Sequence, residues 1–296
     1  MMQSGRQAIV LGFPDFAEQG ERLATAAGLG FERVRLHRFP DGESRVSLPA
    51  ALPPRVIFCR TLDRPNGKLV ELALAAHTAR ELGVAHLTLV APYLCYMRQD
   101  KAFRPGEAVS QRIVGGLLAD WFDTLVTVDP HLHRVHSLRE AVPARRALCL
   151  TAASLMSDFL AEAVEEAVLV GPDRESRQWV AAIAQRGGLE HCIGEKQRLG
   201  DRDVRVRFPE TLVRGRNLVL VDDVASTGRT LEAAALALAP SRPASLSVLV
   251  THALFLEGAL ERLKAAGVND VWSTDSISHV TNRLRLAPLL AAAIAV

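Results

Sequence analysis

Short apolar segments alternate with longer segments rich in alanine and leucine along most of the chain. Apolar runs without polar alternation are typical of strands that are covered on both faces of a parallel sheet. The pattern predicts strands at Gln7–Leu11, Arg55–Cys59, His86–Ala91, Thr124–Val128, Ala167–Val170, Asn217–Val221 and Ser245–Thr251. It predicts helices at Phe16–Ala27, Gly67–Leu82, Ala108–Trp121, Ala153–Glu165, Arg177–Gln185, Thr230–Ala239 and Gly258–Ala266. Because strands alternate with helices, we expect an α/β fold built from βαβ units.

The chain is long enough for two domains. Its 296 residues exceed the usual size of one domain, about 100–200 residues. The alternation of strands and helices is interrupted around Arg139–Ala152, where Pro143 and two consecutive arginines occur. We therefore expect one domain over 1–145 and a second over 146–296, each a mainly parallel sheet flanked by helices.

Composition narrows the class of protein. The chain carries 35 Lys+Arg against 33 Asp+Glu, a net charge of +2, and 49% of its residues are hydrophobic. This mixture is typical of a folded globular protein rather than a disordered one. Non-specific binding to nucleic acid depends on clusters of Lys and Arg. The basic residues of this sequence form no such cluster and barely outnumber the acidic ones. We expect no nucleic-acid partner.

The apolar segments and the cysteines indicate where the protein works. The longest apolar stretch, Leu286–Val296, is interrupted by Pro288 and is shorter than the roughly 20 residues of a membrane span. The run Ala8–Gly12 is too short for the apolar core of a signal peptide. The cysteines are widely spaced and form no Cys-x-x-Cys pair, which is typical of buried thiols in a reducing compartment: Cys59, Cys95, Cys149 and Cys192. We expect a cytoplasmic protein without a membrane partner.

The most informative segment is Val219-Leu-Val-Asp-Asp-Val-Ala-Ser-Thr-Gly-Arg-Thr-Leu231. It predicts a buried strand that delivers two carboxylates, Asp222 and Asp223, and a short loop that opens a helix. Gly228 allows a tight turn, and the backbone N–H groups at the helix start can hold a phosphate. Carboxylates beside an anion site suit a sugar phosphate, because acids accept hydrogen bonds from vicinal hydroxyls. For a generic Asp-Asp pair, the alternative is a capped helix next to a surface acidic pair.

This segment resembles the signature with which type I phosphoribosyltransferases bind phosphoribosyl pyrophosphate. Further motifs resemble the ribose-phosphate diphosphokinase family, over nearly the whole chain and in the family's order: Arg38-Phe-Pro-Asp-Gly-Glu43, Pro92-Tyr-Leu-Cys-Tyr-Met-Arg-Gln-Asp100, Val128-Asp-Pro-His131, Thr251-His-Ala-Leu-Phe255 and Ala287-Pro-Leu-Leu290. The resemblance implies two domains of type I phosphoribosyltransferase-like fold, an ATP side in the first and a ribose 5-phosphate side in the second. It also implies a homo-oligomer.

The reaction implied by the resemblance is transfer of the diphosphoryl group of ATP to the 1-hydroxyl of D-ribose 5-phosphate, which gives 5-phosphoribosyl 1-diphosphate and AMP. The resemblance assigns ATP binding to Phe39, which would stack on adenine, and to Asp41, Glu43, Arg98 and Gln99. Arginine suits such a role because its planar guanidinium binds phosphate oxygens in a bidentate way. Ribose 5-phosphate binding is assigned to Asp222, Asp223, Ser226, Thr227, Gly228, Arg229 and Thr230.

The histidines after Thr124–Val128 raise the question of a metal. Their spacing, at His131, His133 and His136, matches no common zinc pattern, and no cysteine supports one. Taken alone, three such histidines are more typical of a solvated loop. The resemblance selects His131 as a Mg²⁺ ligand, with Asp173 as its counterpart from the second half. Because Mg²⁺ prefers oxygen ligands, a water-mediated contact of His131 is equally open.

Lys196 and Arg198 match the family's catalytic Lys-x-Arg. Two cations beside a diphosphoryl group in transfer would neutralise the charge that develops there. Judged by charge alone, the segment from Lys196 to Arg207 is instead a solvated hairpin, because positive and negative side chains alternate along it.

The chain departs from the family pattern at Ser226, where an Asp is usual, and at Arg229, where a Gly is usual. A Gly-Gly pair is replaced by 174–177, and Gln197 stands where a basic residue is common. Two alternatives therefore stay open. One is a phosphoribosyltransferase that consumes the same diphosphate, and the other is a catalytically silent regulatory homologue that binds the nucleotide.

Overall fold

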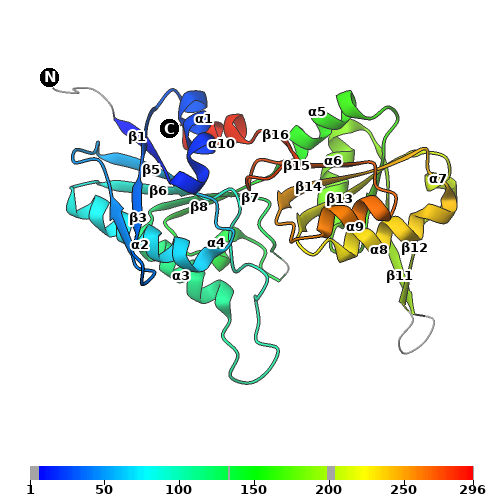
Figure 1. The fold of residues 1–296 in the computed structure, drawn as a ribbon, viewed down its shortest axis with the longest axis horizontal. Coiled ribbons are helices and arrows are strands. Elements are labelled where there is room, and N and C mark those ends of the chain that lie inside the picture. Colours follow the sequence, from blue (N-terminus) through cyan, green and yellow to red (C-terminus); the bar gives the residue numbers. More distant parts are fainter. Residues whose placement is uncertain (1–6, 133, 199–203, 296) are drawn as a thin grey trace. The chain divides into compact units, whose positions relative to one another are not determined.

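The computed structural model describes residues 7–132, 134–198 and 204–295 of the chain. It divides into two compact units, the first formed by residues 1–150 together with 286–296 and the second by residues 151–285. We describe each unit by itself (Figure 1). Within the described ranges, no helix combines the length and the apolar character that a membrane crossing needs.

The first unit is built on a six-stranded parallel sheet with the strand order β2-β1-β5-β6-β7-β8. The strands are β1 (Ala8–Gly12), β2 (Gly30–Arg33), β5 (Arg55–Cys59), β6 (His86–Val90), β7 (Thr124–Val128) and β8 (Arg146–Leu150). Central strands β1 and β7 are buried along their full length, which explains why their sequences are apolar without alternation.

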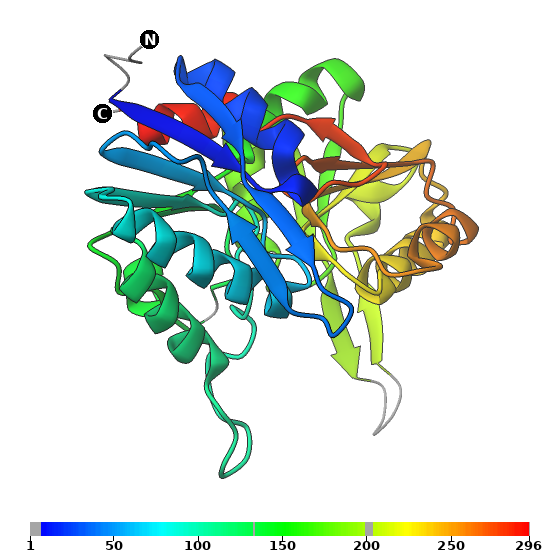
Figure 2. The ribbon, with the colours of Figure 1, turned by 60° about the vertical axis from the view of Figure 1, so that its left-hand side comes forward.

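Helices cover both faces of this sheet (Figure 2). They are η1 (Pro14–Phe16), α1 (Ala17–Ala27), α2 (Pro65–Glu81), α3 (Ser110–Trp121), α4 (Leu138–Ala141) and α10 (Ala287–Ile294). Helices α1 and α10 pack against each other on one face, and α2, α3 and α4 lie on the other. The core under α2 contains two ring contacts of Phe58, to Phe13 and to Phe122, each with 6.0 Å between ring centroids.

The second unit repeats this plan with the strand order β10-β9-β13-β14-β15-β16, again parallel throughout. Its strands are β9 (Val168–Gly171), β10 (Glu190–Ile193), β13 (Asn217–Ala225), β14 (Ser245–Ala253), β15 (Asp270–Thr274) and β16 (Asn282–Leu284). Its helices are α5 (Ala153–Ala163), α6 (Arg177–Gly187), α7 (Glu210–Val213), α8 (Arg229–Leu238), η2 (Ala239–Ser241) and α9 (Ala259–Ala265). Helices α5 and α6 pack together, and so do α8 and α9.

Each unit also carries a two-stranded antiparallel hairpin at the same point of its topology, between its second and third sheet strands. In the first unit the hairpin is β3 (Arg35–Arg38) with β4 (Ser44–Ser47). In the second it is β11 (Glu195–Arg198) with β12 (Val204–Arg207). The expectation of an α/β fold with two mainly parallel sheets is confirmed, and each sheet follows the same chain order.

Three details differ from the sequence-based expectations. The division into units falls after residue 150 rather than 145, because 146–150 form β8, which pairs with β7. Residues 286–296 join the first unit rather than the second, because α10 packs on α1. Cys149 is exposed on edge strand β8, whereas the other three cysteines are buried as expected.

Candidate active site

In an open parallel sheet, ligands bind beyond the carboxyl ends of the strands. In the second unit, both acids of the central motif lie near the carboxyl end of a strand. Asp222 and Asp223 lie within β13 rather than after it, because the strand continues to Ala225 alongside the equally long β14. Asp222 is half-buried and Asp223 is 3% exposed.

The two carboxylates are held by the backbone that follows them. The N–H of Asp223 donates to Oδ1 of Asp222 at 3.0 Å, and the N–H of Val224 donates to Oδ1 of Asp223 at 2.8 Å. Burial, followed by the charge of Asp223 and that of Asp173, raises the pKa of Asp222 well above its ordinary value. The site therefore concentrates more negative charge than the protein alone neutralises.

Asp173 is brought to the same edge by β9, the strand beside β13. Its Oδ1 accepts a hydrogen bond from the N–H of Glu175 at 3.0 Å, and its carbonyl accepts one from the buried hydroxyl of Ser176 at 2.7 Å. These local bonds fix the turn that carries the carboxylate. The structure thus brings Asp173 into electrostatic contact with Asp222, as expected for residues at one edge of a sheet.

These carboxylates suit Mg²⁺. The ion prefers oxygen ligands and is usually held by one or two carboxylates together with substrate phosphates. Because the charges of Asp223 and Asp173 add to burial in raising the pKa of Asp222, a cation beside Asp222 would relieve this repulsion. In the ranges that the structure describes, no three His, Cys, Asp or Glu side chains form a ready-made metal cage.

The anion loop Ser226–Thr230 comprises residues 226–228, which connect β13 to α8, and the first two residues of α8, and it has the form of an anion cradle. Gly228 precedes the first residue of α8 with φ 72°, in the left-handed region, and no side chain of the described residues caps this helix. The N–H of Arg229 lies 3.5 Å from the hydroxyl of Thr227. Because the first N–H groups of a helix lack intrahelical acceptors and carry positive partial charge, they are available to a phosphate.

Two contacts from the following segment support this loop from behind. The guanidinium of Arg262 donates to the carbonyl of Thr227 at 2.7 Å, and the N–H of Leu256 donates to the carbonyl of Ser226 at 3.0 Å. Arg262 also lies 3.7 Å from the carboxylate of Glu232. Sequence reasoning missed Arg262, since nothing in its local pattern distinguishes it from other basic residues of an exposed helix face.

In the first unit, Phe39, Asp41 and Glu43 form the turn of the β3–β4 hairpin. The N–H of Phe39 donates to the carbonyl of Glu43 at 2.8 Å, and the N–H of Glu43 donates to Oδ1 of Asp41 at 3.1 Å. The Phe39 ring is 37% exposed, with the His37 ring 4.7 Å away and the Arg45 guanidinium 6.0 Å away. The ring is thus held and accessible, as a base-stacking residue must be.

Arg98 and Gln99 lie in the segment that follows β6, also at the carboxyl edge of its sheet. Arg98 is exposed and Gln99 half-buried, and the Gln99 carbonyl accepts the N–H of Gln111 at 3.2 Å. The next residue, Asp100, is buried and pairs with Arg134 at 2.6 Å. The segment is anchored on both sides of the exposed arginine, and among the described residues Arg98 is not stacked on Phe39.

The remaining predicted residues are placed only in part. His131 is half-buried in the loop after β7, beyond Asp129 with its positive φ of 39°, and His133 lies outside the described residues. Lys196 and Arg198 lie in β11, opposite Val206 and Val204 of β12. The predicted hairpin is confirmed there. The side chains of 196–198 are not among those described, so their catalytic role stays a prediction.

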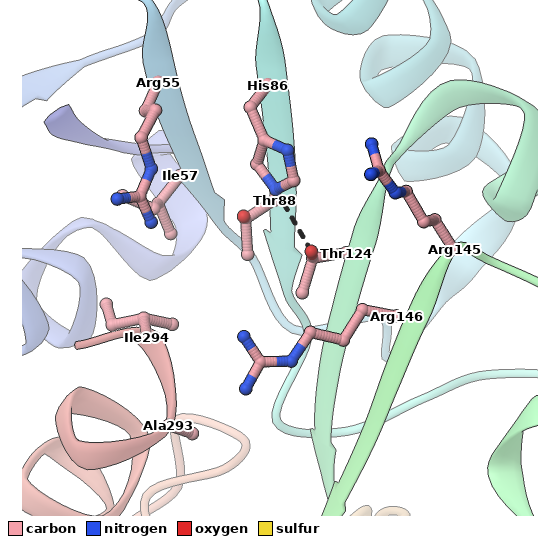
Figure 3. A pocket seen from close by; sticks show the side chains of 9 residues that line it. All are labelled: Arg55, Ile57, His86, Thr88, Thr124, Arg145, Arg146, Ala293 and Ile294. Atoms are coloured by element: carbon pink, nitrogen blue, oxygen red, sulfur yellow. Dashed lines mark hydrogen bonds between the residues drawn. The ribbon is translucent and has the colours of Figure 1, made fainter. Parts of the chain in front are cut away.

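A cavity of about 510 Å³ lies at the opposite edge of the first sheet (Figure 3). Its lining includes the first residues of four strands, Arg55, His86, Thr124 and Arg146, and Nε2 of His86 lies 3.1 Å from the hydroxyl of Thr124. Because these are amino ends of the strands, the cavity is separate from the carboxyl edge at which this unit's motifs converge.

Taken together, an open parallel sheet in each unit, paired acids at a strand end and an anion loop opening a helix define a protein of the phosphoribosyltransferase class. The family model of the N-terminal domain of ribose phosphate pyrophosphokinase matches residues 11–121, and that of the phosphoribosyl transferase domain matches residues 140–280. The chain belongs to the ribose-phosphate pyrophosphokinase family.

Relatives support this assignment over the whole length. The ribose-phosphate pyrophosphokinase of Methanopyrus kandleri is 35% identical over 290 residues, covering 97% of this chain and 98% of its own. That of Thermococcus kodakarensis is 31% identical, covering 89% and 92%. The crystal structure of phosphoribosylpyrophosphate synthetase from Mycobacterium smegmatis has the same fold, with a TM-score of 0.82 over 98% of both chains at 23% identity.

Proposed function

We propose that the chain is a Mg²⁺-dependent ribose-phosphate diphosphokinase that converts ATP and D-ribose 5-phosphate into AMP and 5-phosphoribosyl 1-diphosphate. In the reaction, the 1-hydroxyl oxygen of the sugar forms a bond to the β-phosphorus of ATP. The bond between that phosphorus and the oxygen bridging to the α-phosphate breaks, AMP leaves, and the hydroxyl proton is released. The observation that carries the proposal is the placement of Asp222 and Asp223 beside the anion loop Ser226–Thr230.

The second unit would hold the sugar phosphate. The carboxylates of Asp222 and Asp223 accept hydrogen bonds from the ribose hydroxyls, which also orients the reacting end of the sugar. The backbone N–H groups of the loop, with the hydroxyls of Ser226, Thr227 and Thr230, bind the 5-phosphate. The side chain of Arg229 is exposed beside this loop and adds positive charge. Replacement of the family's usual Asp by Ser226 leaves the amides in place and removes one negative charge near the anion.

The first unit would hold the nucleotide. Phe39 stacks on the adenine, Asp41 and Glu43 present acceptors in the same turn, and Arg98 with Gln99 contacts the phosphates. Exposure of Arg98 on an anchored segment supports this role, because an accessible guanidinium can bind phosphate oxygens.

Charge neutralisation completes the reaction. Mg²⁺, when bound with ATP, would neutralise part of the negative charge of the phosphates. Asp173 is the carboxylate of the second unit that we assign to this ion, and His131 is the first unit's contact, direct or through water. Lys196 and Arg198 would stabilise the charge that builds up on the transferring diphosphoryl group.

One assay tests this function. Purified protein is incubated with ATP, ribose 5-phosphate and Mg²⁺, and AMP, ADP and the sugar product are followed together. AMP should form only when ribose 5-phosphate is present. ADP as the main product would indicate simple phosphoryl transfer and contradict the proposal. Nucleotide binding without any turnover would favour the regulatory homologue instead.

The location and the assembly of the protein are also part of the proposed function. We propose that the protein acts in the cytoplasm and that it assembles as a homo-oligomer. Sedimentation of the purified chain at several concentrations tests the assembly.

A further inference from the structure

The β3–β4 hairpin, which carries Phe39, forms a two-stranded sheet of its own rather than part of the main sheet of the first unit. Leu36 and Val46, which are cross-strand partners, pack on the core and fix the base of the hairpin. Nearer the turn, a cavity of about 570 Å³ borders the hairpin, α2 and the end of β5. Close apolar packing is therefore replaced by polar contacts at the turn end.

Those polar contacts converge on one carboxylate of α2. Glu71 is 4% exposed, and its Oε1 accepts a hydrogen bond from the hydroxyl of Ser44 at 2.9 Å. The guanidinium of Arg38 lies 3.6 Å from the same oxygen. Arg38 and Ser44 are cross-strand partners, the last pair before the turn that contains Phe39. A single oxygen thus contacts both strands at the base of the turn.

The other oxygen of Glu71 is fixed from the sheet side. Its Oε2 lies 2.6 Å from the guanidinium of Arg60, which is 3% exposed, follows β5 and lies 4.2 Å above the Phe13 ring. The same guanidinium lies 3.1 Å from Asp15. Lys68 joins the network by ion pairs to Asp15 at 2.9 Å and to Asp63 at 2.6 Å.

A buried charge network of this kind is weak evidence for stability, because removing charges from water is costly. Such a network can instead hold a group in one defined orientation, which a binding site needs. Here the network links the ends of β1 and β5 and the start of α2 to the hairpin, and its end at Ser44 is only half-buried.

We propose that Glu71 is a positioning residue that sets the orientation of the turn carrying Phe39, and that Arg60 holds Glu71 in the orientation this requires. The inference rests on the proposed role of that turn in binding ATP. Neither Glu71 nor Arg60 is expected to contact the nucleotide, yet both would affect the affinity for ATP.

The decisive variant is Ser44→Ala, which removes the bond between hairpin and Glu71 and leaves the buried pair of Glu71 with Arg60 intact. Ser44→Thr keeps a hydroxyl, and Ser47→Ala is the matched control, because the Ser47 hydroxyl on the same strand has no hydrogen-bond partner among the described residues. Losing a hydrogen bond to a charged group should raise the KM and the Kd for ATP about tenfold in Ser44→Ala. We expect kcat, the KM for ribose 5-phosphate and the Tm to stay close to wild type, and Ser44→Thr to restore most of the affinity.

Amide hydrogen exchange of residues 39–43 provides a readout that does not depend on ATP. Exchange should accelerate in Ser44→Ala and not in Ser47→Ala, because strand β4 loses its bond to Glu71 and only the longer contact of Arg38 remains. Glu71→Gln should raise the KM for ATP likewise and also lower the Tm, since Arg60 then loses a buried partner.

The measurements distinguish a failure of the proposed activity from a failure of the proposed role of Glu71. A wild-type protein that forms no AMP contradicts the proposed function. An active wild type together with a Ser44→Ala variant of unchanged KM and unchanged exchange overturns the inference alone. An equal loss of kcat and Tm in all variants, without a selective change in the KM for ATP, also overturns it, because it shows only a structural role.

Discussion

The guanidinium of Arg262 donates a hydrogen bond to the carbonyl oxygen of Thr227 at 2.7 Å, across 35 residues of sequence. A carbonyl that turned toward a bound phosphate would repel it. By holding the Thr227 carbonyl on the side of α9, Arg262 would keep this oxygen away from the phosphate that we propose for the loop.

Arg262→Met should therefore weaken ribose 5-phosphate binding about tenfold, in line with the loss of one charge-assisted hydrogen bond. ATP binding should not change. Isothermal titration with each ligand separately measures both affinities. Lys264→Met, on the same helix and without a contact to the loop, is the control, and equal sugar-phosphate affinities in the two variants would contradict the role of Arg262.

The raised pKa of Asp222 predicts that this carboxyl lowers the stability of the free protein, although it is needed to bind ribose 5-phosphate. A carboxyl whose pKa is raised by folding contributes stability that is present below its ordinary value of 3.8 and is lost as the pH rises through the higher folded value. At neutral pH, where the carboxyl of the unfolded chain is ionised, placing Asp222 in this environment thus destabilises the ligand-free protein, and Asp222→Asn should raise its Tm by about 3 °C. The difference should vanish near pH 4, while ribose 5-phosphate binding is lost at every pH.

Thermal melts from pH 4 to pH 8, with titration calorimetry at neutral pH, check this prediction. Asp158→Asn is the control, because Asp158 is an exposed carboxylate of the same unit. A lower Tm for Asp222→Asn than for wild type at pH 7 would refute the electrostatic argument.

Gly228 tests the cradle itself. A Cβ at this position would meet its nearest neighbour, the Ala259 side chain, at an ordinary 3.5 Å, so the constraint comes from the φ of 72° rather than from space. Gly228→Val should abolish ribose 5-phosphate binding and spare ATP binding, because a β-branched residue is strained in this region. Gly228→Asn should retain much of the affinity, since asparagine tolerates the left-handed conformation. Calorimetry on both variants decides, and equal losses would point to obstruction instead of strain.

Lys196 tests the transition-state role. Lys196→Ala should lower kcat by roughly 10²–10³ with a much smaller change in KM, because the lost interaction forms only as charge develops. Steady-state kinetics with both substrates varied provide the measurement. Gln197→Ala, the residue between the two cations, should keep nearly full activity. A Lys196→Ala enzyme with nearly wild-type kcat would leave β11–β12 as a solvated hairpin.

His131 tests the metal contact. Chelation should stop the reaction and added Mg²⁺ should restore it, and His131→Ala should need more Mg²⁺ for half-maximal rate. Rates measured across a Mg²⁺ series for wild type and variant give this comparison, with His136→Ala as the control from the same loop. An unchanged Mg²⁺ requirement would exclude His131 from the site.

The sequence alone predicts most of the sheet framework, because strands buried on both faces are apolar throughout. Arg55–Cys59 and Thr124–Val128 have the predicted bounds. Half-exposed elements escape this reasoning. The strands β3 and β4 have short, mostly polar sequences, so no apolar run distinguishes them from loops. The strand β8 begins at the second of two consecutive arginines and none of its residues is fully buried, so its short apolar run at 147–150 does not stand out as a strand covered on both faces.

The candidate site follows the same division. Asp222, Asp223 and the loop after them are predictable, since their chemistry is contained in consecutive residues. Arg262 and Glu71 are not, because each acts on a segment 35 or 27 residues away, and only the fold creates those contacts. The packing of α10 on the first unit is likewise a tertiary interaction, and the apolar C-terminal sequence does not show which unit the helix joins.

The packing of α10 on the first unit affects the order in which the two units can fold. The helix α10, which packs on α1, is made after all of the second unit. During synthesis, residues 151–285 can complete their sheet as one continuous stretch, whereas the unit begun first must wait for Leu290 and Ile294 to cover its remaining apolar surface. Vectorial synthesis usually lets the N-terminal domain finish first. In this chain the first unit to begin is the last to close, and a fragment that stops at residue 150 lacks part of its own core.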